Sequence, residues 1–271
     1  MFCLPSYCLK AGEFMKVTVL TENTACREDV QAQHGLSLLL ETRQKKILFD
    51  MGQDDTFIRN ARMLNVDLTQ VDLAILSHGH YDHGGGLEAF LNLNSKASVY
   101  VHELAFGKYY NGTEKYIGLD HSIQNHPRLV LTKDAVSPDD HLRLSDCNGL
   151  DWSADSWGLN RREGEAFFPD VFFHEQYLEI TEGEKRILIS GCSHKGIGNI
   201  ALHFQPDVFI GGFHLSKETD PQRLQETAQR LLAGNTVYYT GHCTGLKQYE
   251  IMKEIMGDRL QKLSTGCIFQ V

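Results

Sequence analysis

The residues of this chain with the clearest chemical meaning form a histidine-rich loop at 77–83. It carries His78, His80 and His83, with Asp82 between the last two histidines. Imidazole nitrogens and carboxylate oxygens are common protein ligands for zinc and iron. Three imidazoles and a carboxylate on one turn of chain therefore predict a metal site, in preference to a solvated polar turn.

The segments on both sides predict that this loop joins a buried strand to a helix. Residues 71–76 form an apolar run typical of a buried strand, glycines occupy 84–86, and a helix is expected over 85–92. Loops at the end of a sheet are where binding and catalytic residues concentrate. The neighbouring elements thus favour a functional loop.

Three later histidines share one context. His194, His214 and His242 each follow a predicted strand and at least one glycine. Adjacent strands lie about 4.8 Å apart, so side chains beyond their ends can meet at one centre. With the loop, these are more ligands than one tetrahedral ion needs, and they predict two divalent ions about 3.5–4 Å apart. We expect zinc, with iron or manganese as alternatives.

Asp50 ends a predicted strand two residues before Gly52. It could accept a hydrogen bond from a ligand histidine and orient it, or it could simply form a turn. The other histidines lack the strand-glycine context, and we expect them to be surface or packed residues, although His102 and His174 flank the region at 103–175. These are His34, His102, His121, His126, His141, His174 and His203.

Two further features could bind substrate. Lys195 and Gly196 precede a predicted helix, where backbone N–H groups and a lysine could hold a phosphate or carboxylate, although glycine turns before helices are common. Tyr109, Tyr110 and Trp152 are candidates for stacking on flat rings.

The chain is expected to hold an N-terminal extension at 1–14 and one domain at 15–271, with an insertion at about 103–175 that could cap the site. Strands and helices should alternate in two similar halves. Strands are expected at 16–21, 36–41, 46–50, 97–102, 177–181, 185–190, 207–210, 237–240 and near 268, and helices at 54–64, after 196, at 221–233 and from 244.

Composition narrows the class of protein. A chain of 271 residues with 42% hydrophobic content can bury a large core. A net charge of −9 without a basic run argues against nucleic acid, and no apolar stretch reaches the about 20 residues of a membrane span. Seven scattered cysteines fit a reducing cytoplasm. A small-molecule substrate is expected. The acidic composition and the expected outer helices are compatible with a homodimer but do not favour one.

The loop at 77–83, the Asp50-x-Gly52 pair and the later histidines resemble the metallo-β-lactamase superfamily. The resemblance implies an α/β fold with four layers, an αβ/βα sandwich of two mixed β-sheets with helices outside. Residues 191–200, 211–215 and 241–245 resemble the branch that includes 7,8-dihydropterin-6-ylmethyl-4-(β-D-ribofuranosyl)aminobenzene 5'-phosphate synthase.

The resemblance also implies ligands. It assigns one ion to His78, His80 and His194, and the other to Asp82, His83 and His242. One departure concerns the aspartate that bridges the ions in many members. His214 occupies that place, as a ligand or as a proton donor to the leaving group, and Cys192 is the alternative ligand. Asp82 and His214 are thus the candidate catalytic residues.

The expected function is that of a metal-dependent hydrolase or related transferase. It would act on a phosphate- or pyrophosphate-bearing small molecule, such as a dihydropterin, by hydrolysis or pterinylmethyl transfer. Hydrolysis of a lactone or lactam ring fits the same ligands. A di-iron redox protein fits them too, although no flavin-binding domain is visible. A non-enzymatic metal-binding or regulatory protein is the remaining alternative.

Overall fold

The computed structural model describes residues 15–150, 152 and 156–271, so the predicted extension at 1–14 lies outside them. Within the described residues the strands form two seven-stranded sheets and one small four-stranded sheet. The first sheet has the order β18-β1-β2-β3-β4-β5-β8. Its strands are β1 (Lys16–Thr21), β2 (Ser37–Glu41), β3 (Lys46–Phe49), β4 (Leu73–Ile75), β5 (Ser98–His102), β8 (Leu129–Thr132) and β18 (Ile268–Gln270).

The second sheet repeats this construction with the order β17-β16-β15-β14-β13-β10-β9. Each sheet contains an antiparallel hairpin, β2-β3 or β13-β14, followed by parallel strands. This agrees with the two similar halves expected from the sequence. The strands are β9 (Ala135–Asp139), β10 (Leu142–Ser145), β13 (Tyr177–Glu182), β14 (Lys185–Ile189), β15 (Val208–Ile210), β16 (Val237–Thr240) and β17 (Leu260–Lys262).

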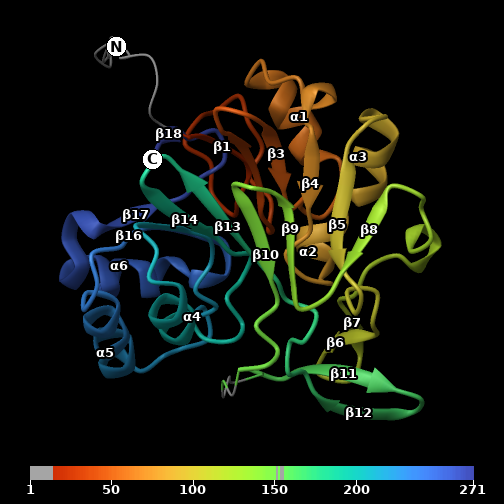
Figure 1. Ribbon diagram of the computed structural model, residues 1–271. Coiled ribbons are helices and arrows are strands. Elements are labelled where there is room, and N and C mark those ends of the chain that lie inside the picture. The colour runs from red at the N-terminus through yellow and green to blue at the C-terminus, as the bar shows by residue number, and fades with distance from the viewer. Residues whose placement is uncertain (1–14, 151, 153–155) are drawn as a thin grey trace.

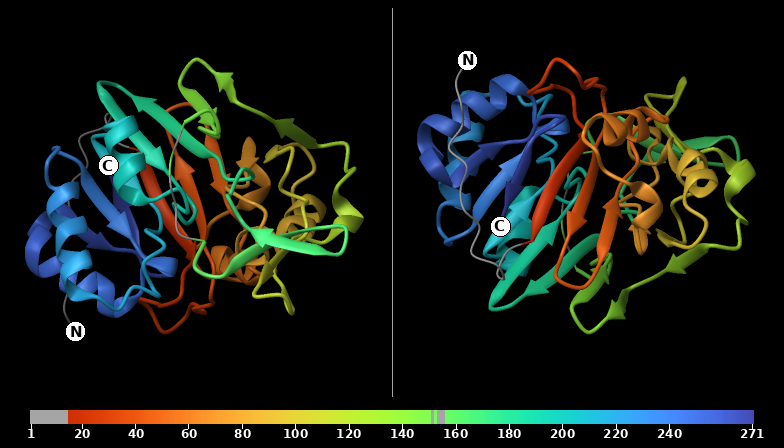
Figure 2. Two further views of the ribbon diagram at one scale, coloured as in Figure 1. Left: turned by 90° about the horizontal axis from the view of Figure 1, so that it is seen from below. Right: turned by 90° about the horizontal axis from the view of Figure 1, so that it is seen from above.

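Apolar residues on both faces of the strands explain the layering. In β2, Leu38 and Leu40 pack into the core between the sheets, whereas Leu39 packs into the core under the helices of the first half. Side chains alternate across a strand, so a continuous apolar run requires cover on both faces. Figure 2 shows the sheets lying between two groups of helices.

The helices supply that cover, and the predicted four-layer sandwich is confirmed. α1 (Thr56–Met63) and α3 (Leu87–Leu93) pack on the first sheet. The second sheet is covered by α4 (Ile197–Phe204), α5 (Pro221–Leu231) and α6 (Leu246–Met256) (Figure 1). The remaining helical turns are α2 (Tyr81–Gly84), η1 (Leu68–Gln70), η2 (His121–Ile123), η3 (His242–Thr244) and η4 (Gly257–Arg259). Among the described helices, none has the length and apolar character to cross a membrane.

The region at 103–175 is not one insertion. β8 completes the first sheet and β9 and β10 complete the second, so only part of the region is added to the sandwich. That part forms the small sheet β12-β11-β6-β7, which projects from the domain at the lower right of Figure 1. Its strands are β6 (Tyr109–Asn111), β7 (Lys115–Tyr116), β11 (Leu159–Glu163) and β12 (Ala166–Pro169).

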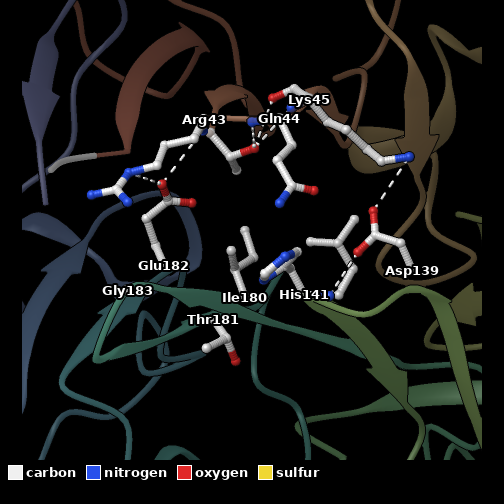
Figure 3. A pocket seen from close by; sticks show the side chains of 11 residues that line it. Arg43, Gln44, Lys45, Asp139, His141, Ile180, Thr181, Glu182 and Gly183 are labelled. Atoms are coloured by element: carbon white, nitrogen blue, oxygen red, sulfur yellow. Dashed lines mark hydrogen bonds and ion pairs between the residues drawn. The ribbon is translucent and has the colours of Figure 1, made fainter. Parts of the chain in front are cut away.

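The parallel strands bring the histidine loops together. β3, β4, β14, β15 and β16 each end immediately before a segment that carries a candidate site residue. The turns that begin β3 and β14 lie at the opposite end of the sandwich. There, Arg43 faces Glu182 and Lys45 faces Asp139 around a cavity of about 230 Å³ (Figure 3), so the charges of that end are balanced.

Candidate metal centre

Three of the predicted ligands from both halves of the chain form one cluster. His78, His80 and His194 are buried, and each offers a nitrogen within 4.8 Å of the other two. His78 and His80 lie on the loop after β4, and His194 lies on the loop after β14. A bound ion at their centre would therefore be held by both sheets.

The hydrogen bonds of His78 show which nitrogen faces the centre. The Ser77 hydroxyl lies 2.7 Å from Asp50 Oδ2 and must donate to this carboxylate. Ser77 Oγ is then the acceptor for His78 Nδ1 at 2.8 Å. His78 Nε2 is left with a lone pair, and it is buried without a partner among the described residues. His80 Nε2 is also buried and unpartnered in the described chain.

His194 is oriented by a residue that the sequence analysis missed. Glu175 Oε1 accepts from the backbone N–H and from Nδ1 of His194, at 3.0 and 2.9 Å. Glu175 Oε2 accepts from the Tyr177 hydroxyl at 2.5 Å. Burial would raise the pKa of Glu175, but His194 outweighs it and lowers that pKa far below the usual range. The carboxylate therefore keeps the proton of His194 on Nδ1.

The predicted ligands of a second ion are oriented in the same way. Asp50 Oδ2 accepts from His83 Nδ1 at 2.6 Å, and Asn23 Oδ1 accepts from His242 Nδ1 at 2.9 Å. The Asn23 amide is fixed because its nitrogen donates to the His242 carbonyl and its oxygen accepts from Gly35 N. Asp50 therefore has the orienting contact expected from the sequence, and Asn23 was missed.

These contacts leave acceptor atoms facing one another. His242 Nε2 lies 3.1 Å from His83 Nε2 and 3.3 Å from Asp82 Oδ2. Two lone pairs and a carboxylate repel at this distance unless a cation or proton lies between them. The donor set therefore fits a metal ion, because imidazole and carboxylate are ligands of zinc, iron and manganese.

The pKa shifts of the buried histidines also favour the binding of a cation. Burial and the neighbouring imidazoles lower the pKa values of His78 and His80 well below normal, and burial lowers that of His242 to about 4. These rings are therefore neutral at pH 7, as ligands must be. At His83, burial is outweighed by Asp50 and Asp82, which raise its pKa. The interior near His83 therefore attracts positive charge.

His34 also lies at the site. It was expected to be a surface or packed histidine. His34 is exposed, but its Nε2 lies 3.2 Å from Asp82 Oδ2. Burial would raise the pKa of Asp82, yet the nearby His83, His242 and His34 lower it well below normal. Asp82 therefore faces the centre as a carboxylate.

A cavity of about 350 Å³ opens over the histidines. Asp82 is the one carboxylate among its described lining residues, whereas Lys115 and Lys217 are cations. Tyr81 and Ile117 give it an apolar wall. The cavity also exposes His214, whose Nδ1 is buried without a partner in the described chain.

Several predicted substrate contacts lie elsewhere. The buried Lys195 donates to the carbonyls of Asp146 and Glu175, so its ammonium is not available to an anion in the cavity. Gly196 is the N-cap of α4 at φ +88°, a conformation that suits glycine. Trp152 packs near His203, away from the cavity lining.

The two tyrosines of this group also have structural contacts. Tyr110 packs against Tyr116 and Phe167 in the small sheet, because the β6-β7 and β11-β12 hairpins bring these rings together. Tyr109 stacks on the ring of His174 with centroids 3.9 Å apart. Neither tyrosine lines the cavity over the histidines.

His174 supports the loop at 77–83. Its Nδ1 accepts from Gly79 N at 2.9 Å, so its Nε2 carries the proton and donates to Asp170 Oδ2 at 3.0 Å. Burial of Asp170 is outweighed by His174, which lowers the pKa of Asp170 to about 2. His102, the other histidine that flanks the region at 103–175, donates from Nε2 to Asp146 Oδ2 away from the centre.

The sequence comparison agrees with this geometry. Residues 31–242 match the profile of the metallo-beta-lactamase superfamily. The chain belongs to this superfamily. The solved structure of Tm1679, described as a metal-dependent hydrolase of the beta-lactamase superfamily, aligns at a TM-score of 0.80 and 27% identity, over 95% of this chain and 99% of that one.

Two relatives come from Methanocaldococcus jannaschii. An uncharacterized protein is 31% identical over 243 residues, covering 85% of this chain and 91% of the relative. The second, named 7,8-dihydropterin-6-methyl-4-(beta-D-ribofuranosyl)-aminobenzene-5'-phosphate synthase, is 28% identical over 285 residues, covering 94% and 96%. This likeness supports the predicted branch. The fold and donor set are those of a metal-dependent hydrolase-like protein of this superfamily.

Proposed function

We propose that this protein is a metal-dependent enzyme that acts on a small molecule bearing a phosphate or diphosphate. The observation that carries the proposal is the charge of the cavity over the histidines. Lys115 and Lys217 line it, and Asp82 is the one acidic side chain among its described lining residues. Asp82 contacts His242 and His34 rather than either lysine, and the lining carries two lysine cations against this one carboxylate. A phosphate is the complementary ligand.

The size and wall of the cavity limit the remainder of the substrate. A volume of about 350 Å³ lies within the range of small-molecule sites. The apolar wall, which includes Tyr81, Ile117 and Leu159, would contact a flat ring, and Tyr81 takes the stacking role first assigned to Tyr109, Tyr110 and Trp152. A dihydropterin diphosphate satisfies both requirements. The relative named as a dihydropterin-related synthase supports this choice.

Two divalent ions, with zinc the first candidate, would be held by the residues that present lone pairs to the centre. His78, His80 and His194 would form the first metal position, and Asp82, His83 and His242 the second. When bound, such ions supply Lewis acidity to a phosphoryl oxygen and to water. The chain fixes their place through Asp50, Glu175 and Asn23, which hold the ligand rings.

His214 would contact the substrate as a neutral hydrogen-bonding group. Its ring lies 4.3 Å from that of His194 between centroids, and it lines the cavity. Burial lowers its pKa well below normal, so it carries no spare proton near pH 7. This favours substrate orientation over proton donation to a leaving group.

The test compares substrates on the zinc-loaded protein. A panel of phosphodiesters, nucleoside diphosphates and a dihydropterin diphosphate, the last with and without an aminobenzene cosubstrate, is set beside a panel of lactones. We expect turnover in the phosphate panel and competitive inhibition by inorganic pyrophosphate. Lactone turnover without pyrophosphate inhibition would replace the proposal with ring hydrolysis. Protein that contains iron and reduces oxygen or nitric oxide would replace it with redox chemistry.

A further inference from the structure

The second metal position has a sulfur atom beside it. Cys192 Sγ lies 3.2 Å from His83 Nε2, and the residue is buried. Its sulfur also lies within 4.8 Å of donor atoms in two separate groups, one with His78 and His83 and the other with His242 and Cys243. Cys192 thus lies between the two metal positions.

His214 does not occupy this place, although its sequence position suggested that it could. Its ring contacts those of His194 and Phe172, and His214 belongs to none of the donor groups found in the described chain. Cys192 reaches the centre instead because the loop after β14 passes directly over it. A methyl group added at Gly191 would lie 3.0 Å from His78 Nδ1.

The hydrogen bonds of His83 fix which of its ring nitrogens faces Cys192. His83 Nδ1 donates to Asp50, so Nε2 is the ring nitrogen that points towards the sulfur and the metal position. A thiol loses its proton when it ligates a metal. A cation bound by His83 and His242 would therefore find a third donor in the thiolate and a fourth in Asp82 Oδ2.

We infer that Cys192 supplies a thiolate ligand to the second metal position and thereby sets its metal preference. Soft thiolate ligands favour zinc or ferrous iron, whereas carboxylate-rich sites suit manganese and magnesium. The ligand set of Asp82, His83, Cys192 and His242 would select zinc or iron there. This inference rests on the proposed metal centre but not on the identity of the substrate.

Cobalt substitution provides the test, because a thiolate bound to cobalt(II) gives an intense near-ultraviolet charge-transfer band. The intact chain of 271 residues is stripped of metal and titrated with cobalt(II) alone. We expect the band in the wild type, its loss in Cys192→Ser and its retention in Cys243→Ser. Cys243 is the matched control, a neighbouring buried thiol whose sulfur donates to the Cys192 carbonyl.

A second variant guards against a folding failure. Cys192→Asp replaces the thiolate by a carboxylate, and we expect it to bind manganese more tightly relative to zinc than the wild type does. A band that survives in Cys192→Ser, a band lost in Cys243→Ser, or an unchanged zinc-to-manganese preference in Cys192→Asp would overturn the inference. These readouts need no substrate, so a protein that shows the band but fails the phosphate panel would overturn only the proposed function.

Discussion

His83 Nε2 and His242 Nε2 lie 3.1 Å apart although 159 positions separate the two residues in the chain. Each ring is held from behind, His83 by Asp50 and His242 by Asn23, so neither can turn away. The pair brings two ring nitrogens to one buried point. A residue that orients either ring should therefore matter almost as much as a ligand.

Asp50→Asn tests this orientation. In the wild type, Ser77 Oγ and His83 Nδ1 both donate to Oδ2 of the carboxylate. An amide nitrogen in that place cannot accept these hydrogen bonds, so the His83 ring would lose its orienting contact. Asparagine tolerates the φ of 58° at this position, so the backbone should persist. We expect metal affinity to fall about 10- to 100-fold, measured by competition with a chromophoric chelator. Wild-type affinity would remove Asp50 from the centre.

His80→Ala should lower the metal content strongly and leave the fold intact. The ring contributes a buried nitrogen to the cluster with His78 and His194 but makes no backbone contact that shapes the loop among the hydrogen bonds found there. Elemental analysis with circular dichroism gives both readouts. His141→Ala, an exposed histidine at the opposite end of the sandwich, is the control. Equal metal content in the two variants would contradict the assignment.

His174→Ala should destabilise the protein and weaken the centre together. It leaves the Gly79 N–H without its acceptor in a buried loop, at a cost of about 1–3 kcal/mol in the free energy of unfolding. Urea unfolding of metal-free protein measures this cost, and zinc titration measures the affinity. Loss of stability with unchanged zinc affinity would show that His174 supports the fold but not the loop geometry.

Lys217→Ala should weaken substrate binding without loss of metal. The lysine is exposed at the cavity rim and has a single hydrogen bond within the described residues, from Nζ to the Trp157 carbonyl at 2.6 Å, so it can turn to a phosphate. This attraction is screened by solvent and worth roughly 1 kcal/mol, or about a fivefold higher KM. Steady-state kinetics on the best phosphate substrate supply the measurement. Lys45→Ala, which alters the ion pair with Asp139 shown in Figure 3, is the matched control. The same KM in both variants would exclude Lys217 from the phosphate site.

Asp146→Asn should change the acid sensitivity of the fold. Burial opposes ionisation of Asp146, but the His102 ring and the backbone N–H groups of Asn148 and Asp134 outweigh it and lower its pKa. A lowered pKa stabilises the folded state above the ordinary value near 3.8, and this stability is lost as the pH falls through the folded value. We expect the variant to be about 1–3 kcal/mol less stable at pH 7, with a smaller difference at pH 3. Urea unfolding at pH 7 and pH 3 measures this. The same loss of unfolding free energy at both pH values would show that the charge of the carboxylate does not stabilise the fold.

The sequence alone predicts the elements that are marked by a local pattern of residues. β1 matches its predicted bounds, and the His78–His83 loop follows a strand as expected, because apolar runs and glycines mark such boundaries. β8 was missed because it is short and its burial is irregular. Glu175 and Asn23 were missed because their role depends on partners 19 and 219 positions away, and no local spacing encodes that contact.

The candidate ligands are divided between the two sheets, and this affects how strongly the sheets are held together. The loop at 77–83 belongs to the first sheet, whereas Cys192, His194 and His242 follow strands of the second. A cation that binds only the joined halves adds RT ln(1 + [L]/Kd) to the free energy of unfolding, about 2.7 kcal/mol at 100 times Kd. Bound metal would therefore hold the two sheets together, and removal of the metal should lower the resistance of the whole domain to unfolding.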